Sequence, residues 1–556
     1  MDQRTLLAIS LSFMLLMAYQ IFMETYYPPE PIPQQIVEQQ PAVADTQKAD
    51  TGPAPSTIGG VRVGKGSQGP VVHEPAPEVA TSAVSKTSGK RYKFEDGAVR
   101  GEIAQLGGRI ASLSFLKHLD KLPPEGKPIQ HLNQDAQEFF FAESGFLGTS
   151  GLKTPTRETS WQITGKDILK NGGELQLTWK GDQGLTFKKI YTFTQDSYLF
   201  TVTDQIVNNS QKAFDLYHYA QFVRVKPTAD DGSPAMAIAD FEGPMGFLDD
   251  TRVQHPYEDL KEADQGQKAT SGWVGISDKF FLAALIPEDT VNVKNFYFDY
   301  DPPAHRSGKV SNKKTIGPGS DITVKTKMYI GPKEVKTLES HNLDLNRAID
   351  YGWFHFLAEP IVQVLLFLNG IVHNFGVAII LLTIGIKLVL YPLANKSYVS
   401  MNAMKKLQPK VEDLKVKHGD NKKTLNEEMM KLYQTNKVNP LGGCLPMIVQ
   451  IPVFFALYKV LFLSVEMRHA PFMLWINDLS AQDPYYVLPV LMGASMYFQS
   501  KLNPTPADPI QAKIMAFLPL IFTFMFLTFP AGLVLYWLLN NVLSIAQQSY
   551  IMKKMG

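Results

Sequence analysis

The chain has 556 residues, with 54 lysines and arginines against 53 aspartates and glutamates, and this balance argues against general nucleic-acid binding. Its single cysteine, Cys444, excludes an intramolecular disulfide and a four-cysteine metal site. A mean hydropathy close to zero conceals a polar first two-thirds and a strongly apolar last third, which indicates a soluble domain joined to a membrane domain.

The N-terminal part predicts a membrane anchor and a tether. Residues 1–23 contain an apolar run typical of either a secretory signal or an uncleaved anchor. Residues 23–28 lack the small-x-small pattern that a signal peptidase needs, which favours a transmembrane anchor. Residues 24–90 are rich in Pro, Ala, Gln, Thr, Ser and Gly, and predict a disordered periplasmic linker. Residues 59–65 match the start of a phosphate-binding loop, but a glycine follows where Ser or Thr is needed, so we reject nucleotide binding there.

Residues 91–345 predict a large periplasmic β-sandwich domain. Segments such as 185–193 and 198–207 alternate apolar with polar residues, and turns rich in Gly, Asp and Asn separate them. Such sandwiches often bind sugars or peptides. The histidines of this region have no metal-ligand spacing, so we interpret them as surface or hydrogen-bonded residues of a scaffold. They are His118, His131, His218, His255, His305 and His341.

Residues 353–392 predict a helix lying on the membrane surface and then a second transmembrane helix. Pro360 marks the start of the first or a bend in it. The second is the apolar run from 367 to 390, long enough to cross a hydrocarbon core of about 30 Å. Lys387 lies inside it, on one face with Thr383 and Tyr391. Two interpretations are equally open: the ammonium faces a wet cavity, or its long stem reaches the headgroups.

Residues 395–439 carry many lysines, which predicts a cytoplasmic segment. Apolar residues recur at helical spacing on both sides of a Gly-Asp-Asn break, and this pattern favours a helical hairpin over a solvated linker with two weak helices. Pro409 is expected to kink the first arm.

Residues 440–551 predict four further transmembrane helices. Pro530 and Gly532 divide the last apolar block into two spans. Lysines flank the cytoplasmic loop 501–513 but are absent from the periplasmic loop 466–484. The count is therefore six spans, with both termini in the cytoplasm.

Polar residues recur along these apolar helices. They either join the helices by hydrogen bonds, at about 0.6 kcal/mol each, or line a hydrophilic cavity together with Lys387. We favour the cavity because several polar stripes accompany a buried cation. No catalytic constellation, metal site or cofactor motif is recognised, so we expect neither an enzyme nor a cofactor. The proposed polar lining comprises Gln450, Ser495, Gln499, Asn540, Ser544 and Gln547.

Four strings in the last third resemble the YidC/Oxa1/Alb3 family of membrane protein insertases. They are VNPLGGCLP at 438–446, APFMLWINDLSAQDPYY at 470–486, LPVLMG at 488–493 and FPAGLVLY at 529–536. The large domain after a first span resembles the Gram-negative members of the family. The resemblance implies an α-helical polytopic bundle of six transmembrane helices, five of them forming the core, with a large periplasmic β-sandwich domain, in the bacterial inner membrane.

The resemblance also implies a function. It implies an insertase and chaperone for nascent or newly made inner-membrane proteins, acting alone or with the Sec translocon, and possible contact of the hairpin with ribosomes or targeting factors. It implies a groove open to cytoplasm and lipid and closed toward the periplasm. Lys387 takes the place of the family's usual arginine. The residues matching the family's substrate path are Thr383, Leu445, Pro446, Tyr536 and Trp537.

Two alternatives belong to other classes. One is a polytopic transporter or channel with a lysine-gated anion site, which the lack of an inverted repeat weakens. The other is a periplasmic sugar-processing enzyme with an elaborate anchor, which leaves the polar stripes of the spans unexplained.

Overall fold

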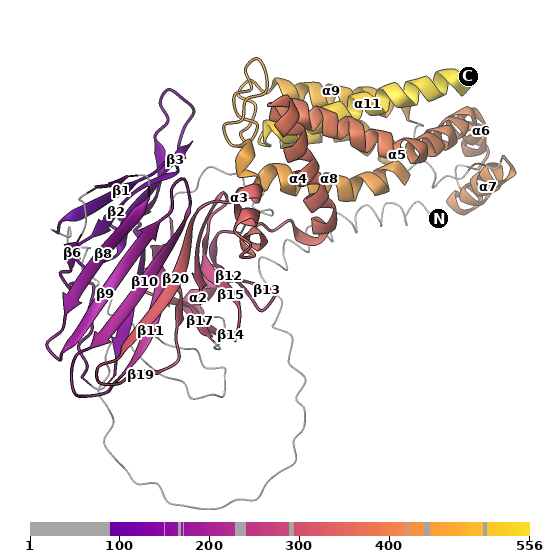
Figure 1. Cartoon of the computed structure of the whole chain (residues 1–556). Coiled ribbons are helices and arrows are strands. Elements are labelled where there is room, and N and C mark those ends of the chain that lie inside the picture. Colours follow the sequence, from indigo (N-terminus) through magenta and orange to yellow (C-terminus); the bar gives the residue numbers. More distant parts are fainter. Residues whose placement is uncertain are drawn as a thin grey trace, which may run out of the picture.

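The computed structural model describes residues 89–149, 151–164, 168–170, 172–227, 241–288, 294–418, 421–436, 438, 445–503 and 509–555. These residues form a β domain and a helical region that lie side by side (Figure 1). The predicted anchor, residues 1–23, and nearly all of the predicted linker, residues 24–90, lie outside the described residues.

The β domain consists of two sheets. The first has eleven strands, whose order is β14 (Gln265–Ala269), β17 (Lys294–Asp301), β18 (Ala304–Val310), β11 (Phe214–Val225), β5 (Phe140–Gly148), β4 (Pro128–Asn133), β3 (Ile110–Leu119), β2 (Val99–Ala104), β1 (Arg91–Glu95) and β7 (Ile168–Lys170), with β19 (Lys314–Ile316) paired to β11. The second has nine, in the order β13 (Thr251–Gln254), β12 (Gly243–Leu248), β15 (Gly272–Ser277), β16 (Phe281–Pro287), β20 (Asp321–Pro332), β10 (Leu199–Asn208), β9 (Leu185–Phe193), β8 (Gly173–Lys180) and β6 (Gln162–Thr164). Of the strand pairs, β1 with β7 is parallel.

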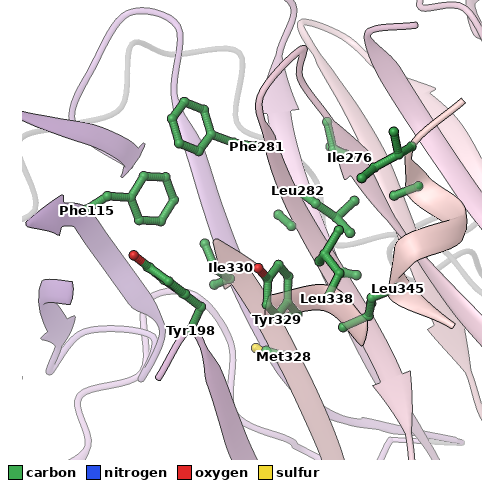
Figure 2. Packing of buried hydrophobic residues seen from close by; sticks show 14 of the residues in the cluster. Phe115, Tyr198, Ile276, Phe281, Leu282, Met328, Tyr329, Ile330, Leu338 and Leu345 are labelled. Carbon is green, nitrogen blue, oxygen red and sulfur yellow. The ribbon is translucent and has the colours of Figure 1, made fainter. Parts of the chain in front are cut away.

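The two sheets pack face to face because their strands alternate apolar with polar side chains. In β9, every second residue from Leu185 to Phe193 is buried, and the residues between are partly exposed. Aromatic side chains join the sheets: the rings of Phe94 in β1 and Phe193 in β9 stack with centroids 4.2 Å apart. Figure 2 shows a second contact of this kind, Phe115 of β3 beside Phe281 of β16. The β-rich character predicted for this region is therefore present as a sandwich.

Charged side chains are also buried between the sheets. The ammonium of Lys189 lies 2.5 Å from Asp204 Oδ1, and His218 Nε2 lies 2.9 Å from Asp204 Oδ2. Nearby, the Arg157 guanidinium contacts Glu143 at 2.6 Å. Burial alone would raise the pKa of Glu143, but the guanidinium groups of Arg157 and Arg109 outweigh burial and hold this pKa at about 2. Since buried charges must be paired, these ion pairs fix which strands can meet at the centre of the sandwich.

The helical region follows the last strand. Its short helices are α3 (Val335–Ser340), η2 (Leu345–Ala348), η3 (Gly352–Phe354) and η5 (Val465–Met467), and α2 (Asp259–Glu262) lies in the β domain. Its longer helices are α4 (His355–Val372), α5 (Phe375–Lys406), α6 (Gln408–His418), α7 (Lys422–Thr435), α8 (Leu445–Leu463), α9 (Val487–Leu502), α10 (Pro509–Phe526) and α11 (Ala531–Met555). Helix α4 lies across the bundle near the β domain, and α6 and α7 lie at the opposite end (Figure 1).

The predicted apolar run from 367 to 390 is not one helix, and this expectation was wrong. Residues 367–372 end α4, and α5 begins at Phe375. The break has a local cause: His373 adopts a left-handed conformation with φ of 52°, and the Asn374 side chain accepts a hydrogen bond from Val377 N. This is a helix end followed directly by an N-cap.

The predicted hairpin boundaries were also wrong. Residues 395–406 continue α5, because Pro392 is accommodated inside that helix. Helix α5 ends at Lys406, and after Leu407 the helices α6 and α7 follow. Pro409 therefore does not kink an arm; it lies in the first turn of α6, where a missing N–H costs no helix hydrogen bond.

Among the described residues, two helices are long and apolar enough to cross a membrane, Gly352–Val372 and Phe375–Lys406. Shorter apolar helices occur at Val449–Leu463 and Lys513–Phe526. The count of six spans therefore stays a prediction.

The β domain and the helical region are joined by side chains from the segment after α8. Arg468 donates to the carbonyl oxygens of Leu119 and Asp120 at the end of β3. Glu466 Oε1 accepts from Val335 N at 3.0 Å. The Arg468 contacts dock the β domain against the bundle, and the Glu466 contact holds the start of α3 beside the same segment.

We expect Glu143→Gln to destabilise the β domain by about 3 kcal/mol, because it leaves the buried Arg109 and the partly buried Arg157 guanidinium groups without this carboxylate. With a folded-state pKa of about 2 against the ordinary 4.5, the intact carboxylate contributes stability that is complete above pH 4.5 and falls as the pH drops toward 2. Hydrogen exchange of β5 and β11 in the full chain measures both effects. Glu125→Gln, at an exposed loop position, is the control, and equal protection in the two variants would contradict the prediction.

Gly493 lies where α9 contacts α10. A Cβ atom there would come within 1.8 Å of Thr523 Oγ1, whereas one at Gly385 would meet nothing within 4 Å. We therefore expect Gly493→Ala to lower the free energy of unfolding by about 1–3 kcal/mol, and Gly385→Ala to leave it unchanged or slightly higher. Thermal melting in detergent measures both; a neutral Gly493→Ala variant would mean that α9 and α10 separate easily.

Candidate functional site

A pocket of about 320 Å³ lies among the long helices. It is bounded by the second half of α5, the end of α9, the middle of α10 and the middle of α11, with part of α8. These parts of α5 and α9 are distant from the β domain (Figure 1). Its lining residues are Lys387, Leu390, Leu393, Ala394, Tyr398, Met401, Val449, Gln450, Ile451, Phe454, Met496, Gln499, Ser500, Asn503, Met515, Leu518, Pro519, Trp537, Asn540, Asn541 and Ser544.

Lys387 points into this pocket. Twelve residues after the start of α5, it lies about 18 Å along the helix axis, and the whole helix of 32 residues is about 48 Å long. Its Nζ donates a hydrogen bond to Ser544 Oγ at 2.8 Å, and that hydroxyl donates to the carbonyl oxygen of Asn540 at 2.7 Å. The ammonium is thus tied to α11, which distinguishes this arrangement from a lysine that extends along its own helix toward the headgroups.

The pocket holds a cation without a fixed counter-ion. Among the described residues, no carboxylate forms an ion pair with Lys387. No group of three or more metal-ligating side chains occurs in the described part of the chain. A partly buried positive charge whose one hydrogen bond among the described residues is to a hydroxyl is an attractive position for an anionic group of a visiting molecule.

The structure brings together six of the predicted site residues and separates the others. The six that line the pocket are Lys387, Gln450, Gln499, Trp537, Asn540 and Ser544. Thr383, Ser495, Tyr536 and Gln547 do not line it, and the side chains of Leu445 and Pro446 lie outside the described ones.

The separated residues have other hydrogen-bond partners. Thr383 is buried and donates to the Ile379 carbonyl of its own helix. Ser495 accepts from Asn541 Nδ2 at 3.0 Å, which joins α9 to α11. Tyr536 is buried and accepts from Gln450 Nε2 at the edge of the pocket. The contacts of Ser495 and Tyr536 join neighbouring helices, whereas that of Thr383 lies within α5.

Sequence reasoning missed four polar residues of the pocket. Tyr398 and Asn541 are both buried, and Ser500 and Asn503 come from the end of α9. Asn541 had a signal, because it adjoins Asn540 in an apolar run. Tyr398 had none, because its segment was assigned to the hairpin.

The other end of the bundle is covered by residues 464–486. Gly532 N at the start of α11 donates to the Leu479 carbonyl at 3.0 Å. Asp483 is fully buried and accepts from Trp475 Nε1 and from Leu488 N, at the start of α9. The pocket therefore lies toward the end of the bundle opposite to this hydrogen-bonded segment.

Comparisons with known proteins match the whole described chain. Family models match residues 91–364, as the YidC periplasmic domain, and residues 367–556, as the 60Kd inner membrane protein. A membrane protein insertase YidC of Magnetococcus marinus is 54% identical over 560 residues, covering 100% of this chain and 99% of the relative. The chain belongs to the YidC family of membrane protein insertases.

Other family members are similar over most of their length. The YidC insertase of Methylobacillus flagellatus is 44% identical over 472 residues, covering 84% of each chain. Among solved structures, an active YidC insertase crystal structure has 20% identity and a TM-score of 0.37, covering 83% of this chain and 92% of that chain.

The pocket predicts a pattern of thiol labelling. In a Cys444→Ser background, we expect a charged maleimide to label Lys387→Cys, because the polar side chains of the pocket lining admit water. Thr383→Cys should stay unlabelled because position 383 is only 1% exposed. Val389→Cys is the matched control: Val389 is 77% exposed but lies outside the pocket, where lipid excludes a charged reagent. Equal labelling at 387 and 389 would contradict a separate aqueous pocket.

Proposed function

We propose that this chain inserts membrane proteins by receiving their polar segments in the pocket around Lys387. The observation that carries the proposal is a single ammonium, bonded to Ser544 Oγ and without a carboxylate partner among the described residues, inside a helical bundle of an insertase family member. Such a charge attracts an acidic segment of a substrate and leaves its apolar segment to partition into lipid.

The topology that we propose has six spans. Residues 1–23 supply the first, and α5, α8, α9, α10 and α11 supply the core. Helix α4 then lies on the periplasmic membrane surface, α6 and α7 lie in the cytoplasm, and the β domain lies in the periplasm. Trp353 and Phe356 support the placement of α4, because they are 87% and 62% exposed and amphipathic surface helices expose such residues to lipid.

Short helices lower the barrier that a substrate must cross. Helices α8, α9 and α10 have 19, 16 and 18 residues, which correspond to about 28, 24 and 27 Å. Each is shorter than a hydrocarbon core of about 30 Å, and a short span thins the bilayer around it. A substrate segment therefore crosses less hydrocarbon beside these helices, and the pocket hydrates part of that path.

Hydrophobic partition supplies the free energy, so no nucleotide is required. The substrates are newly made membrane proteins with short polar tails. The Sec translocon, ribosomes and targeting factors are further partners in this proposal, with α6 and α7 at the cytoplasmic end as the contact for the latter two.

We expect the purified chain in liposomes to insert a small, single-span test protein with an acidic tail, measured by protease protection. Lys387→Ala should reduce protection about fivefold or more, which corresponds to about 1 kcal/mol of lost attraction, and Lys387→Arg should keep most of it. Lys513→Ala, an exposed lysine outside the pocket, is the matched control.

The outcomes of this assay distinguish three hypotheses. Protection with the intact chain and its loss in Lys387→Ala alone support insertion through the cation. Equal protection in all variants would show that the charge is not used. No protection above empty liposomes, with the protein folded, would contradict autonomous insertion.

A further inference from the structure

A second and larger pocket, of about 800 Å³, lies between the β domain and α4. Its wall is held by Arg252 of β13, whose guanidinium contacts Asp350 at 2.6 Å and donates to the carbonyl oxygens of Arg347 and Ile349. These contacts hold residues 347–350, which precede α4, against β13. A volume in the range of small-molecule sites is thus kept open by specific contacts.

Both signs of charge face this pocket. The guanidinium of Arg347 is half exposed and approaches Glu359 of α4 only to 3.9 Å, beyond hydrogen-bond distance. Both carboxylate oxygens of Glu339 in α3 accept from Gln363 Nε2, Oε1 at 3.1 Å and Oε2 at 3.4 Å. With Asp250, Asp350 and Arg252, the lining has four carboxylates against two guanidinium groups. It offers donors for a phosphate and acceptors for an ammonium.

Helix α4 connects this pocket to an apolar surface. His355, Glu359 and Gln363 follow at steps of four and line the pocket. Phe356, Phe367 and Ile371 are 62%, 66% and 61% exposed and form the neighbouring face of the same helix. The two faces are offset by about 60–100°. A molecule with a charged head and apolar tails can therefore occupy both at once.

We propose that this pocket binds the phosphoethanolamine headgroup of a membrane phospholipid. Arg347 contacts the phosphate, Glu359 and Glu339 contact the primary ammonium, and the acyl chains lie along Phe356 and Phe367. A primary ammonium has N–H groups that can donate to the two carboxylates, whereas the quaternary ammonium of choline has no N–H group.

Other headgroups fit less well. Choline is usually bound by exposed aromatic faces, and the aromatic residues of the lining, Phe247 and Tyr351, are only 9% and 8% exposed. A glycerol headgroup has no positive charge to balance the excess of carboxylates. The inference rests on the proposed surface placement of α4 and is independent of insertion.

The test uses the full chain in nanodiscs that contain phosphatidylglycerol mixed with either phosphatidylethanolamine or phosphatidylcholine. The protein is then released from the nanodiscs, and the lipids that stay bound to it are identified by native mass spectrometry. We expect retained phosphatidylethanolamine, and about tenfold less of it in Arg347→Gln and in Glu359→Gln, because each loses a charge-assisted hydrogen bond. Arg100→Gln and Glu262→Gln, exposed positions in the β domain, should retain it fully.

Three results would overturn the proposal. They are equal retention of the two zwitterionic lipids, unchanged retention in both pocket variants, and retention of added glycerophosphoethanolamine without retention of the lipid, which would make the ligand a soluble molecule. Quenching of Trp353 by brominated lipids, taken as the difference from Trp353→Phe, tests the placement of α4 separately; absence of quenching would also overturn the proposal while leaving the insertion assay unaffected.

Discussion

The hydrogen bond between Lys387 and Ser544 imposes the main constraint on the helical region. A cation within an apolar bundle is costly unless a polar partner meets it, on the order of 3 kcal/mol even on insertion scales. The partner here comes from α11, so α5 and α11 must lie together at that depth. The pocket lies around this contact, and the neighbouring helices bring both polar and apolar side chains to its lining.

The polar residues of the bundle divide between two roles that sequence reasoning set against each other. Asn541 and Ser495 join α11 to α9, as expected of polar residues that hold helices together. Gln499 and Asn540 line the pocket instead. Asn540 and Asn541 are adjacent and about 100° apart around α11; both line the pocket, and Asn541 also bonds to α9. Helical spacing predicted a polar face but not which helix would cover each part of it.

The parts that sequence predicted well are those with a strong local period. In β9 and β10, the alternation along the sequence matches the alternation of buried and partly exposed side chains in the structure. The break between α4 and α5 was missed because it depends on a left-handed histidine and one asparagine side chain, inside a run that is apolar on both sides. The continuation of α5 past Pro392 was missed for the opposite reason: a proline that normally ends a helix is tolerated within this one. Buried ion pairs such as Lys189 with Asp204 have no signal in a single sequence, since their partners meet only across strands.

The one acceptor that the cation contacts bears on how a lysine, rather than an arginine, is accommodated at this position. Ser544 Oγ donates to the Asn540 carbonyl and so presents its lone pairs to the ammonium. A compact ammonium can use one such acceptor and direct its remaining donors into the pocket. A guanidinium has five donors in a rigid plane and would need more acceptors than this one hydroxyl to be satisfied. Lysine and arginine would therefore both place a positive charge in the pocket. The hydrogen-bond acceptors around that charge decide which of the two side chains is better accommodated.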